Sequence, residues 1–225
     1  MIVLGLTGSI GMGKSTAAAA LRRLGVPVHD ADASVHRLLG PGGAAVAAVA
    51  AAFPGTAGPA GIDRAALARR AFADPSALTR LEAILHPMVR AEEERFLRRA
   101  AARRQPLAVL DIPLLFESGG DRRCDAVLVV SAPPFLQRAR VLARPGMTPE
   151  RLAAILGRQM PDAEKRRRAD FVVATGLGRN QSLRRLAEIV RVLRDRAAGN
   201  RGGTKPGRRR KGRRWGRNAR GRARY

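Results

Sequence analysis

The 225-residue sequence predicts an α/β protein in which helices flank an open parallel sheet. Five short apolar segments suit buried strands, at residues 2–7, 26–29, 107–111, 126–131 and 170–174. Segments with helical spacing separate these strands, and this alternation is typical of a parallel sheet. The first strand runs directly into a glycine-rich turn and then a helix, at the edge where such sheets bind ligands.

The bulk composition suits one such domain with an inserted lobe. Apolar residues make up 45% of the chain, which is enough for a sizeable core. The single cysteine, Cys124, excludes an internal disulfide framework and suits a reducing cytoplasm. The N-terminus lacks the pattern of a secretion signal, and no apolar run approaches the ~20 residues that span a bilayer. We therefore expect a cytoplasmic protein with no membrane anchor. The sequence does not determine the oligomeric state, for which we favour a monomer.

The glycine-rich turn, residues 8–15, is GSIGMGKS, which fits the phosphate-loop pattern G-x-x-x-x-G-K-[ST]. Glycines let the backbone turn its N–H groups inward around a phosphate chain. Lys14 can then reach the β- and γ-phosphates, and the Ser15 hydroxyl can bind Mg²⁺. A chance match in a glycine-rich chain is the alternative, but the flanking strand and helix favour a nucleotide phosphate site.

Two carboxylates, Asp30 and Asp32, follow the second strand at the edge where the phosphate loop is expected. A kinase needs a carboxylate beside its acceptor hydroxyl, to orient it and to accept its proton. The alternative is that either residue only caps the next helix. We favour the cap for Asp30 and the functional role for Asp32, although the spacing alone leaves both alternatives open for Asp32.

Between the second and third strands lies more chain than a simple crossover needs. Helices are predicted at residues 44–53, 63–72, 76–85 and 88–104. We interpret residues 36–104 as an inserted helical lobe that binds the second substrate. His86 precedes Pro87, which predicts an extended or turn geometry, and a substrate contact and a structural role are equally compatible with it.

The third strand ends at Asp111, in the position of the acidic residue that steadies a Mg²⁺ water in phosphate-loop enzymes. Residues 112–117 follow as a loop at the same edge, where Glu117 can shape the acceptor pocket. Helices at 135–144 and 147–159 are then predicted, and the first carries Arg138, Arg140 and Arg144. We interpret residues 138–165 as a lid whose arginines neutralise a phosphoryl group in transfer, the alternative being solvated surface arginines.

A closing amphipathic helix is predicted at 181–196, and we place the end of the folded domain at residue 198. Residues 199–225 hold 12 Lys and Arg and no acidic residue, which is almost half of the net charge of +25. This Gly/Arg-rich tail is predicted to be disordered. It could contact RNA or other polyanions weakly through their phosphates.

Several motifs together resemble one enzyme family. They are LTGSIGMGKST ending at Thr16, VHDAD at 28–32, LHP at 85–87, DIPLLFE at 111–117, RQMP at 158–161 and ADFV at 169–172. Over residues 1–196 the sequence resembles the dephospho-coenzyme A kinases. The resemblance implies ATP-dependent phosphorylation of the ribose 3′-hydroxyl of dephospho-CoA, which gives CoA and ADP in the last step of CoA synthesis. It also implies a phosphate-loop fold of five parallel strands with helices on both sides, a helical acceptor-binding lobe and a lid.

The resemblance also implies site residues. Asp32 would be the catalytic carboxylate, assisted by Lys14 and Arg140, and Mg²⁺ would be held by Ser15 and, through water, by Asp111. The ATP contacts would be Gly11, Met12, Gly13, Lys14, Ser15, Thr16 and Arg144. The acceptor contacts would be Asp32, His86, Pro113, Leu114, Leu115 and Glu117.

One departure from the family lies after the last strand, where many members carry an asparagine-containing turn. Here the turn is Thr175-Gly176-Leu177-Gly178, so the adenine contact stays open. Two alternative functions are considered. One is another small-metabolite or nucleoside kinase of similar build, and the other is a basic nucleic-acid-binding protein that uses ATP as a switch.

Overall fold

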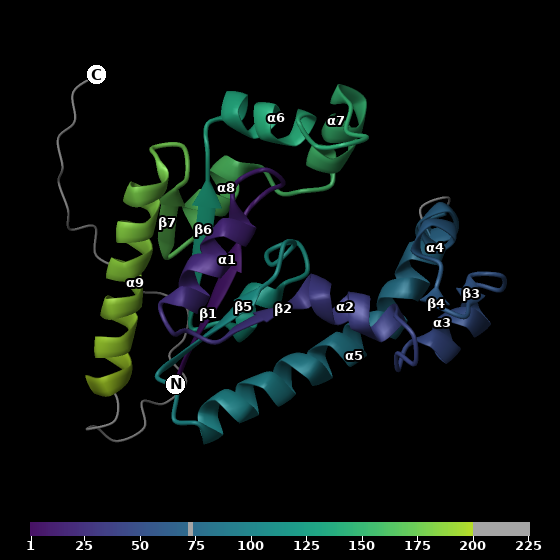
Figure 1. Ribbon diagram of the computed structural model, residues 1–225, viewed down its shortest axis with the longest axis horizontal. Helices are drawn as coiled ribbons and strands as arrows, with labels where there is room; N and C mark the ends of the chain where they lie inside the picture. The colour runs from purple at the N-terminus through teal and green to yellow at the C-terminus, as the bar shows by residue number, and fades with distance from the viewer. Residues whose placement is uncertain (72–73, 200–225) are drawn as a thin grey trace.

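The centre of the computed structural model, which describes residues 1–71 and 74–199, is a five-stranded parallel sheet (Figure 1). Its strands stand in the order β2-β5-β1-β6-β7, and every neighbouring pair is parallel. Their bounds are β1 Ile2–Thr7, β2 Val28–Asp30, β5 Leu107–Asp111, β6 Ala126–Ser131 and β7 Phe171–Ala174. The predicted fold class is confirmed, although the second strand begins and ends later than the predicted 26–29.

Alternate residues of the strands enter two different cores, because successive side chains of a strand point to opposite faces. On one face Leu4, Leu128 and Val173 pack against α1 (Lys14–Arg23) and α9 (Arg179–Gly199). On the other face Val127 and Val129 join a cluster with residues of α5 (Pro75–Ala102), and α8 (Asp162–Arg168) packs beside β6. Both faces of the sheet are therefore covered, which explains the nearly continuous apolar strands.

A third hydrophobic cluster lies beside the sheet, at the far right of Figure 1. It is built from α2 (Ala31–Leu39), α3 (Val46–Ala52), α4 (Arg64–Ala71), the N-terminal half of α5 and a hairpin of β3 (Ala57–Gly58) and β4 (Gly61–Ile62). Its buried residues include Leu38, Val49, Phe53, Ile62 and Leu67. We call these elements the outlying helical unit. The hairpin lies between the helices predicted at 44–53 and 63–72.

The predicted break between two helices at 76–85 and 88–104 is wrong. A single helix, α5, runs from Pro75 to Ala102 with Pro87 inside it, so the extended or turn geometry predicted for His86 is also wrong. Proline removes one hydrogen bond of the helix, but Leu85 and Val89 on either side are packed into hydrophobic clusters. Pro87 and His86 are exposed. Packing on both sides of the proline therefore holds the helix continuous.

Two helices, α6 (Pro134–Leu142) and α7 (Pro149–Gly157), lie above the edge of the sheet at which β6 ends (Figure 1). A short 3₁₀ helix, η1 (Gly120–Arg123), precedes β6. Within residues 1–71 and 74–199, no helix has the length and apolar character that crossing a membrane requires. The predicted basic tail lies, from residue 200 onward, outside the described residues.

Candidate active site

The phosphate loop joins β1 to α1 and opens on a cavity of about 820 Å³. Gly11 and Gly13 have φ angles of 77° and 91°, a left-handed conformation that side chains disfavour. A Cβ at Gly11 would also lie 2.6 Å from Val141 Cγ2. The structure brings seven predicted site residues to this cavity, together with Gly11 and Gly13: Lys14, Ser15, Thr16, Asp32, Pro113, Arg140 and Arg144.

Lys14 forms an ion pair with Asp111 at the first turn of α1. Its Nζ donates to Asp111 Oδ1 over 2.8 Å, and only 2% of the Asp111 side chain is exposed. Burial raises the pKa of Asp111 above its ordinary value, and the neighbouring Lys14 charge offsets part of that rise. Lys14 is thereby held beside the phosphate loop, and the buried carboxylate stays charge-paired.

Asp30 and Asp32 have different local roles at the start of α2. Asp30 is the N-cap, because its Oδ1 accepts a hydrogen bond from the Ala33 N–H over 3.0 Å. The predicted cap is therefore confirmed. Asp32 lies in the first turn of the helix, is exposed and lines the cavity.

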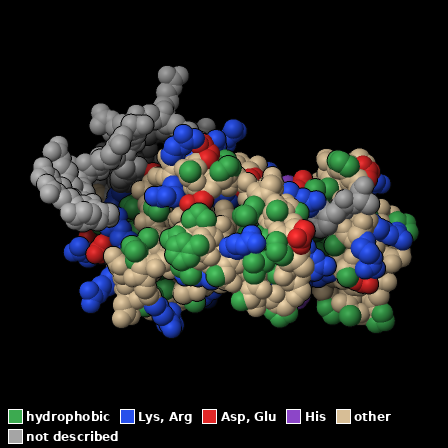
Figure 2. Space-filling view, turned by 90° about the horizontal axis from the view of Figure 1, so that it is seen from above, with side chains coloured by type: hydrophobic (Ala, Val, Ile, Leu, Met, Phe, Trp, Pro, Cys, Tyr) green, Lys and Arg blue, Asp and Glu red, His purple; other side chains and the backbone are tan. Residues whose placement is uncertain are grey.

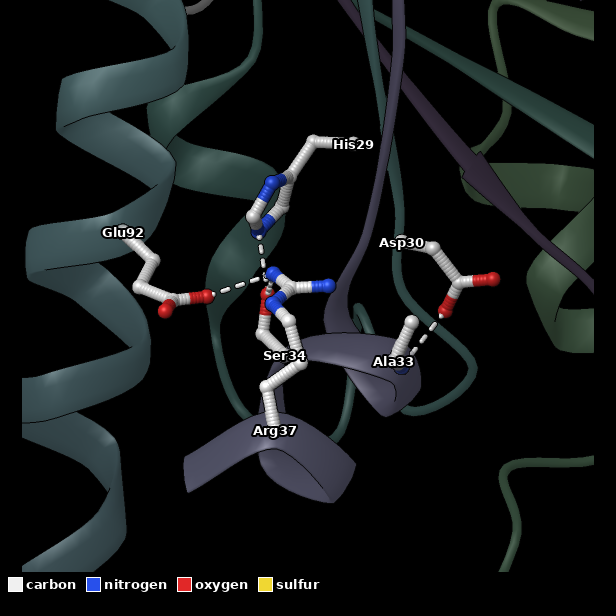
Figure 3. A network of polar contacts seen from close by, with 6 residues as sticks. All are labelled: His29, Asp30, Ala33, Ser34, Arg37 and Glu92. Carbon is white, nitrogen blue, oxygen red and sulfur yellow. Dashed lines mark hydrogen bonds and ion pairs between the residues drawn. The ribbon is translucent and has the colours of Figure 1, made fainter. Parts of the chain in front are cut away.

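The helix that carries Asp32 is tied to α5 by a polar network (Figure 3). The Arg37 guanidinium donates to Ser34 Oγ over 2.9 Å and to Glu92 over 2.7 Å. Ser34 Oγ also lies 3.2 Å from Nε2 of the buried His29. These contacts connect the end of β2, α2 and α5, so they fix the position of the first turn of α2.

The predicted acceptor contacts in the loop after β5 lie in three different environments: at the cavity, at the surface and in the core. Pro113 lines the cavity, and its carbonyl accepts a hydrogen bond from Thr7. Leu114 is 43% exposed, whereas Leu115 is fully buried in the core between the sheet and α5. Neither leucine is among the cavity-lining residues. Leu115 therefore acts here as a core residue.

Glu117 anchors the segment between α7 and α8. Its Oε1 accepts a hydrogen bond from the Met160 N–H over 2.7 Å and lies 2.9 Å from Nζ of the fully buried Lys165. A buried ion pair of this kind is costly to break, because removing one partner leaves an uncompensated charge. The structure thus places Glu117 away from the cavity lining and gives it a positioning contact instead.

Met12 and His86 also lie apart from the cavity lining. The Met12 side chain is buried, and its Sδ accepts from the Ala132 N–H. A nucleotide contact of Met12 would therefore involve its backbone alone. His86 is exposed on α5.

Arg140 lies against the turn after β7. Its guanidinium donates to the Thr175 carbonyl over 2.9 Å and to Thr175 Oγ1 over 3.1 Å. It also reaches the Gly11 carbonyl over 3.4 Å. Arg140 therefore connects α6, the turn after β7 and the phosphate loop. Arg138, the third arginine of this predicted segment, is exposed and does not line the cavity.

Three polar residues that contact the phosphate loop were not among the predicted site residues. Gln137 donates to the Ile10 carbonyl, Gln159 accepts from the Ile10 N–H, and Thr175 donates to the Met12 carbonyl. Gln159 belongs to the RQMP motif, and Thr175 belongs to the unusual turn after the last strand. The sequence analysis singled out both segments, so these two residues could have been proposed as site residues. Gln137 lies inside an amphipathic helix, where no local pattern distinguishes it.

Ser15 lines the cavity with a hydroxyl, whereas the buried carboxylate of Asp111 is paired with Lys14 and is not among the cavity-lining residues. Hydroxyl and carboxylate oxygens are donor types that Mg²⁺ prefers. Among residues 1–71 and 74–199, no three His, Cys, Asp or Glu side chains are grouped so as to hold a metal ion by themselves. The donors present fit Mg²⁺ in a site of the kind that takes its remaining ligands from water and substrate phosphates.

The strand–loop–helix unit, with Lys14 and Asp32 facing one cavity, defines a phosphate-loop kinase. The comparisons with known proteins specify the family. The family model for dephospho-CoA kinase matches residues 2–179. The chain therefore belongs to the dephospho-CoA kinase family.

Several relatives support this assignment. The chain is 67% identical over 166 residues to a dephospho-CoA kinase of Paramagnetospirillum magneticum, covering 74% of this chain and 78% of the relative. It is 59% identical over 194 residues to that of Rhodospirillum rubrum, covering 86% and 92%. A crystal structure of a Thermus thermophilus protein is similar with a TM-score of 0.74 and 40% identity, over 85% of this chain and 96% of that one. The fold also matches a Campylobacter jejuni dephospho-CoA kinase, with a TM-score of 0.65, 24% identity and 88% and 98% coverage.

Proposed function

We propose that this protein transfers the γ-phosphoryl group of ATP to the ribose 3′-hydroxyl of dephospho-CoA, producing CoA and ADP in the last step of CoA synthesis. Membership of the dephospho-CoA kinase family supports this substrate pair. The single observation that carries the mechanism is that Lys14 of the phosphate loop and the exposed carboxylate Asp32 line the same cavity.

At the phosphate end of the cavity, backbone amides of the loop and the N-terminus of α1 would bind the β- and γ-phosphates. Lys14 would add a point charge there, at the position where Asp111 already holds its ammonium group. Ser15 and Asp111, the latter through water, would hold Mg²⁺, which when bound neutralises charge on the phosphate oxygens.

At the acceptor end, Asp32 would orient the 3′-hydroxyl toward the γ-phosphorus and accept its proton. A positioned carboxylate can do this because it is an ionised acceptor within hydrogen-bond reach of the alcohol. The network through Ser34 and Arg37 keeps the first turn of α2 in place. Pro113 would bound the acceptor on the side of β5.

The base of ATP would occupy the part of the cavity near the turn after β7. Leu183 of α9 lines the cavity and is partly exposed, and an apolar lining suits a flat heteroaromatic ring. Arg140 lies against the same turn, and Arg144 lines the cavity nearby. We propose that these two arginines balance negative charge on the nucleotide phosphates during transfer.

We further propose that residues 36–104 bind the acceptor and that residues 138–165 act as a lid. The separate hydrophobic cluster of the outlying helical unit and the placement of α6 and α7 above the sheet edge support this division. The substrate contacts assigned to His86, Leu114, Leu115 and Glu117, the monomeric state, the cytoplasmic location and an RNA contact of the tail remain predictions.

The test is ADP release by the purified protein with Mg·ATP, with and without dephospho-CoA, followed by mass spectrometry and ³¹P NMR of the product. We expect turnover that depends on dephospho-CoA and a product with a 3′-phosphate. Nucleosides and sugars serve as competing acceptors. Turnover with one of them in place of dephospho-CoA would contradict the proposal.

A further inference from the structure

Besides the Gly11 carbonyl, which Arg140 reaches over 3.4 Å, two carbonyl groups of the phosphate loop accept shorter hydrogen bonds from side chains that lie outside the loop. Gln137 Nε2, on α6, donates to the Ile10 carbonyl over 2.7 Å. Thr175 Oγ1, in the turn after β7, donates to the Met12 carbonyl over 2.8 Å. The loop is therefore held from two elements that are far from it in sequence and that flank the cavity on the nucleotide side.

These bonds also determine where two amide N–H groups point. In a trans peptide the C=O and N–H of the same peptide unit point in opposite directions. The Ile10 carbonyl shares its peptide with the Gly11 N–H, and the Met12 carbonyl shares its peptide with the Gly13 N–H. When Gln137 and Thr175 draw the two carbonyls outward, the N–H groups of Gly11 and Gly13 are turned the opposite way.

The loop needs such external bonds because of its composition. Gly11 and Gly13 have φ angles of 77° and 91°, and a glycine backbone has more accessible conformations than that of any other residue. Without an external contact, the two peptide planes could rotate away from the orientation that binds phosphate. Gln137 is 7% exposed, so its bond to the loop competes little with water.

A contact to the preceding peptide, which joins Ser9 to Ile10, also restrains the loop. Gln159 Oε1 accepts from the Ile10 N–H over 3.1 Å, so one amide side chain binds the N–H of Ile10 and another binds its C=O. The residue after Gln159 donates its N–H to Glu117. The segment that carries Gln159 is thus itself fixed to the loop after β5.

We propose that Gln137 and Thr175 are positioning residues that orient the Gly11 and Gly13 amides toward the phosphates of the bound nucleotide. The inference deepens the proposed function, since it rests on the nucleotide occupying this cavity. It predicts that loss of either side-chain donor weakens binding of the diphosphate and leaves binding of the nucleoside unchanged.

The test at residue 175 uses two variants, Thr175→Val and Thr175→Ser. Valine keeps the shape and removes the hydroxyl, whereas serine keeps the hydroxyl. By isothermal titration calorimetry we expect Thr175→Val to bind ADP roughly 5- to 10-fold more weakly, the scale of one net hydrogen bond. Thr175→Ser should stay within about 3-fold of the unchanged protein. Adenosine affinity, measured by saturation-transfer NMR, should be equal in all three proteins.

The test at residue 137 uses Gln137→Met, with Gln105→Met as the matched control at the opposite edge of the sheet. Gln137→Met should lose ADP affinity to a similar extent, and Gln105→Met should not. In steady state the loss should appear in KM for ATP more than in kcat. Thermal unfolding of every variant shows whether it is folded. Inorganic pyrophosphate, which lacks the nucleoside, measures phosphate binding alone.

Three results would overturn the proposal. Equal ADP affinities of the valine and serine variants would show that the hydroxyl does not act through its hydrogen bond. An equal loss of adenosine affinity would place Thr175 at the base instead of the phosphates. Failure of the unchanged protein to bind pyrophosphate or ADP would contradict an oriented loop. By contrast, ADP binding without turnover of dephospho-CoA would contradict only the proposed function.

Discussion

At the scale of single residues, Asp30 and Asp32 lie two positions apart but have different roles. Asp30 caps α2, whereas Asp32 is exposed at the cavity. We expect Asp32→Asn to lower kcat by roughly 10²-fold or more, because an amide cannot take the proton of the ribose 3′-hydroxyl. The KM for ATP should change little. Steady-state kinetics with dephospho-CoA measure both, and near-normal turnover would contradict the role of Asp32.

The cysteine at position 124 is expected to be chemically inert in the folded protein. Burial raises the pKa of the Cys124 thiol to about 12, so almost no thiolate exists near neutral pH. Its Sγ lies 3.7 Å from the Gly120 carbonyl. We expect Ellman's reagent to label the native protein very slowly and the protein in guanidinium chloride at once. Rapid stoichiometric labelling of the native protein would refute this.

The buried His29 makes the stability of the protein depend on pH. Burial lowers the pKa of His29, and the Arg37 charge acts in the same direction, while Glu93, Glu92 and Asp30 oppose it. Since the unfolded histidine has a pKa near about 6.5, the unfolded state binds the proton more readily. The contribution of His29 to stability is therefore complete above that pH and decreases as the pH falls below it.

Urea unfolding of the unchanged protein and of His29→Gln, at several pH values between 5 and 7.5, measures this effect. The free energy of unfolding of the unchanged protein should fall toward low pH more steeply than that of the variant. Parallel pH profiles of the two proteins would show that His29 does not cause the dependence.

At the scale of elements, Pro87 inside α5 is the clearest test of how tertiary packing acts on a helix. A proline in a helix interior costs up to about 3 kcal/mol, and Pro87 is exposed, so its ring contributes little packing. We expect Pro87→Ala to raise the free energy of unfolding by about 1–3 kcal/mol. Pro75→Ala is the control, because proline is well tolerated in the first turn of a helix.

Chemical denaturation of both variants decides the outcome. A stability unchanged or lowered in Pro87→Ala would mean that the proline is compatible with the curvature of α5 and that its missing N–H costs nothing.

The elements that the sequence predicted correctly are those with a local cause. The five strands follow from apolar runs, and the Asp30 cap follows from a side chain that reaches the N–H of Ala33 within its own turn. The continuity of α5 could not be predicted in this way, because it depends on clusters that contact Leu85 and Val89 from elsewhere in the chain.

In the candidate site too, features with a local cause were predicted correctly, and features that depend on distant residues were not. Lys14, Ser15 and Asp32 lie at the cavity, as motifs of strand ends and loops indicated. Leu115 and Glu117 belong to an equally recognisable motif, but one side chain is in the core and the other contacts Lys165, 48 residues further along the chain. Such long-range partners leave no periodic signal in the sequence.

At the scale of the whole molecule, the tail is expected to be dispensable for catalysis. Lys and Arg side chains are spread over the face shown in Figure 2 and do not form one stripe. In the sequence, basic residues are concentrated in the tail, with 12 Lys and Arg in residues 199–225. A protein without residues 200–225 should keep kcat and KM within about 2-fold, because none of the predicted site residues belongs to this segment.

RNA binding should be measured for the full-length protein and for the protein without residues 200–225. If the tail contacts RNA, its removal should weaken binding strongly and reduce the dependence of binding on salt. A large loss of kinase turnover on truncation would contradict an accessory role of the tail.

The continuous helix α5 has a mechanical consequence. Its 28 residues make a rod about 42 Å long at 1.5 Å per residue, with one end in the outlying helical unit and the other against the sheet. A tilt of about 5° at the sheet end would displace the far end by about 3.7 Å, on the geometry of such a rod. Small rearrangements beside β5 would therefore be amplified, as by a lever, into movements of the outlying helical unit that are comparable to the width of an atom.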